Sequence, residues 1–160
     1  MKSAAIRAVL GGRTRQEIEA LTDEFVPRLL ARGMHADALA VLEGHRRAGD
    51  LLVLLSASPD LYVPAIGQAL GFAEALCTRV EWQGERLSGR LTTANRRGAE
   101  KVRCLEALRR EHPRLPVVAY GNAASDLEHL ALAERATLVN GSARARRAAA
   151  RLNIDCVTWH

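Results

Sequence analysis

The run LLVLLS, residues 51–56, carries most of the information about the fold. It is a short, continuous apolar segment that ends in a hydroxyl, a pattern typical of a strand buried on both faces of a parallel sheet. The residues after it have the composition of a helix start, with Ser58 as N-cap and Pro59 at the first helical position. We therefore predict a strand that leads directly into a helix ending near Leu70.

Helical and strand patterns alternate through the rest of the chain. A capping box of Thr14 and Glu17 opens a predicted helix, in which Pro27 indicates a kink or break. We expect helices over 15–32, 36–48, 98–111, 126–133 and 142–152, strands over 116–120, 137–139 and 154–159, and a hairpin formed by 75–81 and 86–92. This alternation predicts an α/β fold with a doubly wound, mostly parallel, Rossmann-like sheet and helices on both faces.

Composition excludes several classes of protein. The net charge of +5 could indicate nucleic-acid binding, but arginines occur in nearly every segment and only two Trp and two Tyr are available for stacking. We therefore expect no nucleic-acid partner. No apolar stretch approaches the roughly 20 residues that a membrane span needs, and no signal-peptide pattern is present, so we expect a cytoplasmic protein. The cysteines, Cys77, Cys104 and Cys156, indicate buried thiols rather than disulfides or a zinc site.

Lysine usage is unusual. Of the 23 basic residues, 21 are arginine, and the only lysines are Lys2 and Lys101. Chance explains this pattern, but so does a site that needs a compact ammonium instead of a planar guanidinium.

Candidate site residues follow from the rule that ligands bind beyond the carboxyl ends of parallel strands. The segment Ser56-Ala57-Ser58 offers a hydroxyl, exposed amides and a helix start, which suit a phosphate. Asp126, beside a loop that begins with Gly121, is either a helix cap or a carboxylate for metal binding or acid-base work. Taken singly, each residue is better explained as a helix cap without a ligand, because such caps are common.

The joint pattern resembles a known family. The order LVLLS at 52–56, GAEK at 98–101 and VVAYGNAASD at 117–126 is similar to the second, third and fourth sequence motifs of the haloacid dehalogenase-like hydrolases. The wider stretches SASPDLYV, LSGRLTTANRRGAEKVRCL and YGNAASDLEHLALAERATLVNGS resemble the phosphoserine phosphatase-like branch. The resemblance runs from about residue 12 to the end, and implies a helical cap portion over 1–48 and an incomplete α/β core over 49–160.

The resemblance also implies residue roles. Ser56 and the Ala57 amide would bind the phosphoryl group of a small phosphorylated molecule, and Lys101 would neutralise its charge. Asp126, with Asn122, would hold a magnesium ion. These roles agree with the physics of phosphoryl transfer, which depends on positioning and charge stabilisation. The family activity is hydrolysis of phosphomonoesters through an aspartyl-phosphate intermediate.

Two departures from the family stand out. The family begins with a D-x-D motif whose first aspartate attacks phosphorus, and none of the six aspartates here has that spacing. Asn122 stands where many relatives have a metal-binding Asp, which weakens the magnesium site because an amide carries no formal charge. We therefore predict that this chain alone is inactive.

The strand that carries the D-x-D motif lies at the centre of the family's sheet, between the strands at 51–56 and 116–120. Without that strand, the strands at 51–56 and 116–120 pair with each other, pair with another segment, or leave backbone N–H and C=O groups without hydrogen-bond partners. The chain is a fragment, a gene read from an internal Met, or a degenerate family member. A missing N-terminal segment or a partner chain would supply the aspartate strand. The alternative function is a non-enzymatic phosphate-binding or protein-interaction module.

Other chemistry finds no support in the sequence. Nucleotide-loop, nucleophile-elbow, zinc-protease and dinucleotide motifs are absent. The five histidines lack ligand spacing and are most simply surface residues: His35, His45, His112, His129 and His160. The arginines of 144–151 indicate a solvated helix face, or a patch for an anionic partner.

Overall fold

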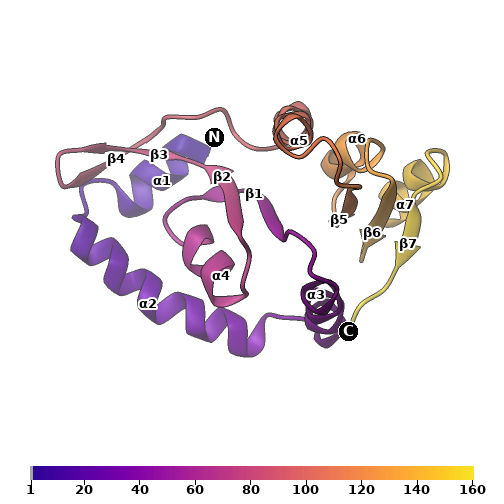
Figure 1. Cartoon of the computed structure of the whole chain (residues 1–160). Coiled ribbons are helices and arrows are strands. Elements are labelled where there is room, and N and C mark those ends of the chain that lie inside the picture. The colour runs from indigo at the N-terminus through magenta and orange to yellow at the C-terminus, as the bar shows by residue number, and fades with distance from the viewer. Residues whose placement is uncertain (1) are drawn as a thin grey trace. The chain divides into compact units, whose positions relative to one another are not determined.

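The computed structural model describes residues 2–160 and has an α/β fold with mostly parallel strand pairing (Figure 1). The chain forms two compact units. The first comprises residues up to 34 and 39–96, and the second comprises 35–38 and 97–160. The division into a helical cap over 1–48 and a core over 49–160 stays a prediction.

The helices and strands follow one another along the whole chain. The helices are α1 (Lys2–Leu10), α2 (Arg15–Arg32), α3 (Ala36–Ala48), α4 (Val63–Ala69), α5 (Ala99–Glu111), the short 3-10 turn η1 (Ala124–Asp126), α6 (Leu127–Leu130) and α7 (Ala143–Ala150). The strands are β1 (Val53–Pro59), β2 (Glu74–Thr78), β3 (Val80–Gln83), β4 (Arg86–Leu91), β5 (Val118–Gly121), β6 (Arg135–Val139) and β7 (Asp155–Val157).

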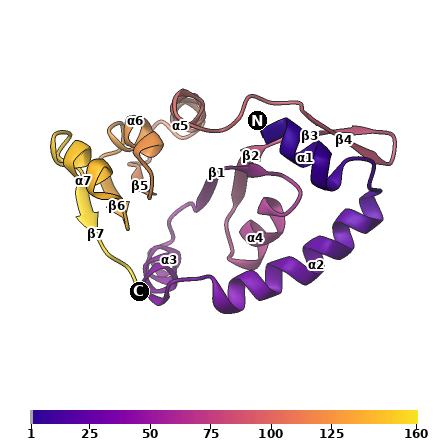
Figure 2. The same cartoon turned by 180° about the vertical axis from the view of Figure 1, so that it is seen from behind.

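The first unit is built around the parallel pair β1–β2. In Figures 1 and 2, α4 lies between α2 and this pair, while α1 lies beside the β3–β4 hairpin. Ile6 of α1 and Ile18 of α2 are buried in one cluster with Val80 and Leu87 of the hairpin. At Gly89, φ is +76°, and a Cβ would lie 2.7 Å from the Arg7 Cα. Glycine is therefore required there for α1 to pack closely on β4.

The end of β1 differs from the prediction. The strand continues through Ser58 to Pro59, which pairs with Thr78 after an irregularity in register, and the next helix begins only at Val63. Ser58 is therefore not a helix cap. The predicted helix start is wrong because the segment bridges two strands: the Asp60 amide donates to the Thr78 carbonyl, and the Asp60 carboxylate accepts from the Val80 amide.

The hairpin is confirmed, but its first arm is shorter than predicted. It consists of β3 and β4, which pair antiparallel, whereas residues 74–78 form β2 and pair parallel with β1. The alternating pattern over 75–81 therefore covers the end of one strand and the start of another. The helix α1 was not predicted, because its nine residues contain no strong start or stop signal.

The predicted helices α2 and α3 are confirmed at their bounds, and the capping box at Thr14 forms as expected. Pro27 lies inside α2, and the helix continues past it without a break. Leu39 of α3 is 39% exposed and belongs to neither apolar cluster.

The second unit contains a parallel sheet with the strand order β5-β6-β7. Its core is a cluster of apolar side chains from α6, β6, α7 and the segment before β7: Leu127, Leu130, Leu138, Ala145, Ala149 and Ile154. The predicted strands and helices of this region are all present, most with shorter bounds. The small alanines of α7 allow that helix to pack closely on the sheet.

Both parallel sheets have an open edge. In the sheets formed by residues 2–160, β1 has one neighbour, β2, and β5 has one neighbour, β6. These are the two strands between which the resemblance expects an additional central strand. An unpaired strand edge presents free backbone donors and acceptors, which is a reason for another strand to add there.

Candidate functional site

The end of β1 carries the first group of candidate residues, Ser56, Ala57 and Ser58, which are all half-buried. The Ser58 amide donates to the Ser56 Oγ at 3.1 Å, so the hydroxyl closes a local turn as an acceptor. Because this bond uses the hydroxyl oxygen only as an acceptor, its proton can still be donated, for example to a phosphate oxygen. Because α4 starts four residues after Pro59, a helix N-terminus does not follow the serine directly, as the sequence suggested.

Lys101 and Asp126 form the second group, in the other unit. The Lys101 ammonium donates to the Asp126 Oδ1 at 2.8 Å, and the two side chains are only 13% and 6% exposed. Lys101 lies in the first turn of α5, after Gly98, whose φ is +55°. Asp126 ends the η1 turn after β5. The strand end and the helix start thus bring a cation and a carboxylate into a buried ion pair.

The loop from Gly121 to Asp126 is organised by the aspartate itself. Its Oδ2 accepts from the amides of Asn122 and Ala123 at 3.1 and 3.0 Å. A Cβ on Gly121 would lie 2.7 Å from the Asp126 Cβ, so only glycine permits this closure. Both carboxylate oxygens therefore accept hydrogen bonds, one from a cation and one from two backbone amides.

These contacts control the charge of the carboxylate. Burial alone would raise the pKa of Asp126, but the hydrogen bond and the charge of Lys101, together with the Ala123 and Asn122 amides, hold it below its usual value. Asp126 is therefore ionised at neutral pH, as a partner for the ammonium requires.

His129, in α6, is a residue of this region that sequence reasoning missed. It was expected at the surface, but only 5% of it is exposed, and its Nδ1 has no hydrogen-bond partner among residues 2–160. Burial, followed by the positive charge of Lys101, lowers its pKa from 6.5 to about 4, although Asp126 acts in the opposite direction. Its position three residues after Asp126, between Leu127 and Leu130 on a short helix, was the available signal.

The described residues do not by themselves fit a magnesium site. Among residues 2–160, no group of three or more His, Cys, Asp or Glu side chains lies close enough together to hold a metal ion. The Lys101 ammonium already neutralises Asp126, and Asn122 adds an exposed amide rather than a carboxylate. Magnesium prefers carboxylates and water, so further oxygen ligands would be needed.

The structure thus brings together Lys101, Asp126 and the Asn122 loop in one unit, and places Ser56 and Ala57 at a strand end in the other. The convergence of the two groups on one phosphate stays a prediction. The cysteine prediction is confirmed for Cys77 and Cys104, which are buried, and is wrong for Cys156, which is exposed on β7. No helix in the described part of the chain has the length and apolar character needed to cross a membrane.

Comparison with known proteins decides the family. The sequence pattern of the haloacid dehalogenase-like hydrolases matches residues 1–131. The chain belongs to this family. The sequence-based assignment to the haloacid dehalogenase-like hydrolases is therefore confirmed.

Individual relatives agree with this membership. The haloacid dehalogenase-like chain is 37% identical over 139 residues to protein CicA of Caulobacter vibrioides, a match that covers 84% of this chain and 60% of CicA. It therefore spans less than two thirds of the length of that curated relative.

Solved structures show the same fold at lower identity. A protein of unknown function from Bordetella pertussis aligns with a TM-score of 0.84 at 21% identity, over 97% of this chain and 72% of that chain. A probable phosphoserine phosphatase from Vibrio cholerae aligns with a TM-score of 0.72 at 15% identity, over 92% of this chain and 43% of that chain. The likeness to the phosphoserine phosphatase fold, expected from the wider sequence stretches, is thus present in the structure.

Proposed function

We propose that this chain supplies the phosphate-binding part of a phosphomonoester hydrolase and that it lacks the attacking aspartate. In this account, Ser56 and the Ala57 amide bind the phosphoryl group, and Lys101 neutralises its charge. Asp126 holds Lys101 in place. The observation that carries the proposal is the buried ion pair of Lys101 and Asp126, which keeps an ammonium ordered at a strand end.

The ion pair favours phosphate chemistry because of its position. Ligands bind beyond the carboxyl ends of parallel strands, and Asp126 follows β5 at that edge. An ammonium held there stabilises the charge that develops on phosphoryl oxygens during transfer. Membership of the haloacid dehalogenase-like hydrolases and a fold shared with phosphoserine phosphatases support the same reaction class.

Hydrolysis by the family route needs a carboxylate that attacks phosphorus and expels the alcohol, after which water cleaves the aspartyl phosphate. None of the six aspartates is spaced as a D-x-D pair, so a missing N-terminal segment or a partner chain would have to supply that strand. The open edges of β1 and β5 give such a strand two places to pair. The same strand would add carboxylates to Asp126 and Asn122, which would complete a magnesium site. A cytoplasmic location is part of the proposal, and three cysteines that form no disulfide among residues 2–160 fit a reducing compartment.

The second candidate function is a non-enzymatic phosphate-binding or protein-interaction module. The observation that favours it is the pairing of Asp126 with Lys101 and two backbone amides, which leaves the described residues without a free carboxylate cluster. The hydrolase and the phosphate-binding module both require phosphate binding at the Ser56 and Lys101 groups, only the hydrolase requires an upstream aspartate, and a protein-interaction module requires neither.

Phosphate binding is tested by titration of inorganic phosphate into the wild type and Lys101→Met at low ionic strength. Methionine keeps the length of the stem and deletes the charge. We expect the amides of Ala57 and Ser58 to shift in the wild type and the affinity to fall roughly tenfold in Lys101→Met, with little dependence on magnesium. Identical titrations of the two proteins would reject the role of Lys101.

A further inference from the structure

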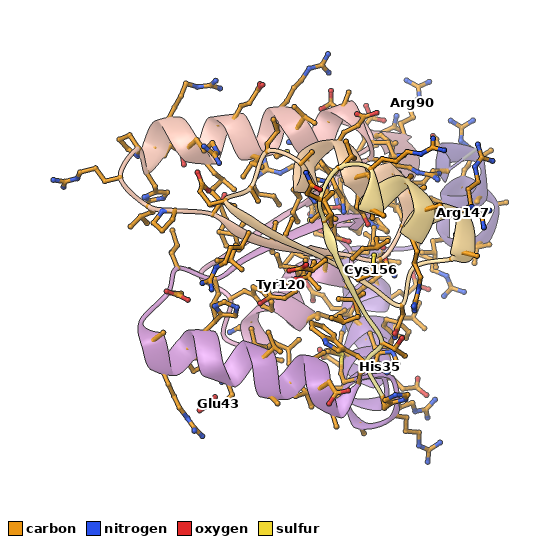
Figure 3. All side chains as sticks on the ribbon, turned by 90° about the vertical axis from the view of Figure 1, so that its right-hand side faces the viewer. His35, Glu43, Arg90, Tyr120, Arg147 and Cys156 are labelled. Carbon is orange, nitrogen blue, oxygen red and sulfur yellow. The ribbon has the colours of Figure 1, made fainter. Side chains whose placement is uncertain are left out.

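Helix α7 carries arginines that the proposed function does not use. Arg144, Arg147 and Arg151 are exposed and follow one another at intervals of three and four residues, so they lie on one face of the helix. Together they span two turns, or about 10 Å of helix axis. The opposite face is buried in the core of the second unit through Ala145 and Ala149, which are 1% and 0% exposed. These three exposed residues form an arginine stripe, of which Arg147 is labelled in Figure 3.

The charges of the arginine stripe are not paired within the described chain. None of its three guanidinium groups makes a hydrogen bond or ion pair with another of residues 2–160. No Asp or Glu lies between Glu134 and Asp155. The fourth arginine of the helix, Arg146, has a different role, because it donates to the Gly141 carbonyl and the Thr158 hydroxyl.

Other helices of the protein compensate their arginines internally. In α2, α3 and α5, a glutamate pairs with an arginine three or four residues away. Helix α7 contains no acidic residue that could do the same. Its positive charge is therefore available to an anion outside the helix.

This arrangement costs helix stability. Arg144 lies in the first turn of α7, where a cation meets the positive end of the helix dipole. Arginines three or four residues apart also repel each other. Exposure to water alone does not account for a sequence with both costs. An anionic partner does, because all three charges would attract it.

The residues around the arginine stripe favour a protein partner over a membrane or a nucleic acid. The apolar side of α7 packs in the core of its own unit, so the helix has no apolar face to insert into a lipid surface. No residue from 142 to 155 is aromatic, so nucleobases find no ring for stacking. Carboxylates on successive turns of a partner helix repeat at the spacing of the stripe, and each can accept two hydrogen bonds from a guanidinium.

We propose that the arginine stripe of α7 is a docking surface for an acidic helical segment of a partner protein. This inference goes beyond the hydrolase function and does not depend on phosphate binding at Ser56 and Lys101. It gives the protein-interaction alternative a surface and a class of partner. Because exposed ion pairs contribute little individually, the binding is weak and sensitive to salt.

The direct test uses a fluorescent, alanine-based peptide whose glutamates are spaced three and four residues apart. Its Kd is measured by fluorescence anisotropy at low ionic strength, for the wild type and two variants. The test variant is Arg144→Gln/Arg147→Gln/Arg151→Gln. The matched control removes the same charge from three exposed arginines of the same unit, as Arg103→Gln/Arg110→Gln/Arg114→Gln.

We expect the Kd of the test variant to be roughly tenfold or more above that of the wild type, and that of the control to stay within about twofold. Added sodium chloride should weaken the binding to the wild type. Equal Kd values for the test variant and the control would contradict the proposal. So would a wild type that does not bind the peptide.

The other classes of partner are measured at the same ionic strength. The probes are a single-stranded oligonucleotide and vesicles that contain phosphatidylserine. If either bound the wild type more tightly than the peptide does, and lost that binding in the test variant, the assignment to an acidic protein would be overturned.

Amide shifts of the wild type locate the binding surface without any substitution, and they decide the question if the test variant does not fold. The peptide should shift the amides of the arginine stripe and leave those of Ala57 and Asn122 unchanged. Peptide shifts that exclude the stripe would overturn this inference. Inorganic phosphate that fails to shift Ala57 and Asn122 would reject the proposed function and leave this inference standing.

Arg144→Glu separates a docking surface from a merely solvated helix face. The midpoint of urea denaturation should rise, because a carboxylate replaces a cation in the first turn. A docking surface also requires the Kd for the acidic peptide to rise, roughly threefold or more, whereas Arg110→Glu should leave it within about twofold. A higher midpoint with an unchanged Kd would reject the docking surface.

Discussion

Asp126 is the residue at which most interactions of the second unit's candidate site meet. One of its oxygens fixes Lys101 and the other fixes the loop that begins at Gly121. The sequence indicated this residue as either a cap or a functional carboxylate; its side chain accepts from the amides of the loop before η1, and its functional role stays a prediction. Asp126 contacts Lys101, 25 positions earlier in the chain, because the loop after a strand meets the start of a helix there. Local sequence patterns do not show which elements will meet.

Substitution of Gly121 tests how closely this loop is packed. Gly121→Ala places a Cβ about 2.7 Å from the Asp126 Cβ, so the loop must shift. We expect the free energy of unfolding to fall by roughly 1–3 kcal/mol, measured by urea denaturation. Gly44→Ala is the control, because no atom lies near its Cβ inside α3, and it should stabilise by about 0.5–1 kcal/mol. An unchanged midpoint for Gly121→Ala would show that the loop is looser than described.

His129 predicts a pH dependence of stability. Its pKa is about 4 in the folded protein and 6.5 ordinarily, so between these pH values the unfolded chain binds a proton that the folded protein excludes. The contribution of neutral His129 to the free energy of unfolding is complete above pH 6.5. It is lost as the pH falls toward 4, by up to ~1.4 kcal/mol per pH unit.

Urea denaturation at pH 7 and pH 5 measures this effect. His129→Leu should show a smaller loss of stability between the two pH values than the wild type. His35→Asn, at an exposed histidine labelled in Figure 3, is the control and should keep the wild-type difference. Equal losses in His129→Leu and the wild type would mean that His129 is not buried in its neutral form.

At the scale of elements, the sequence was most informative where local and tertiary signals agree. The helix α2 begins at a capping box and carries buried Ile18 and Val26, so its bounds were predictable. The segment Ser58-Pro59-Asp60 has equally good helix-start chemistry, but it joins β1, β2 and β3 instead. The segment forms a strand and not a helix start because it pairs with a strand about 20 residues later. The residues of the segment alone do not reveal that pairing.

The capping box of α2 gives an element-scale prediction. The Thr14 Oγ1 accepts from the Glu17 amide at 3.2 Å, and the Glu17 carboxylate accepts from the Thr14 amide at 2.7 Å. Thr14→Ala should lower the free energy of unfolding by about 0.5–2 kcal/mol, because the first turn loses its acceptor. Thr92→Ala, at an exposed threonine after β4, should change it little. Equal effects of the two substitutions would show that the box does not stabilise α2.

At the scale of the whole molecule, the fold class and the family were predictable from the sequence, whereas the pairing of strands was not. The strands that flank the family's central strand each have one neighbour in residues 2–160. A sequence pattern identifies strands but not their partners. The open edges therefore had to come from the structure.

The missing aspartate predicts the activity of the isolated chain. With magnesium and a generic aryl phosphate, purified protein should show no turnover above the buffer, because the covalent route needs a nucleophile. An intact phosphoserine phosphatase in the same assay provides the positive control. Magnesium-dependent turnover that survives further purification and disappears in Asp126→Ala would reveal a nucleophile among the 160 residues.

The central prediction, made from the sequence and not tested by the structure, is that one phosphate binds both at the end of β1 and at the Lys101–Asp126 pair. An amide-shift titration of the wild type with inorganic phosphate tests it most directly, by following Ala57 at the first group and Asn122 and Ala123 at the second. We predict that all three amides shift along one isotherm with a single Kd. Shifts confined to one group, or two different Kd values, would contradict it.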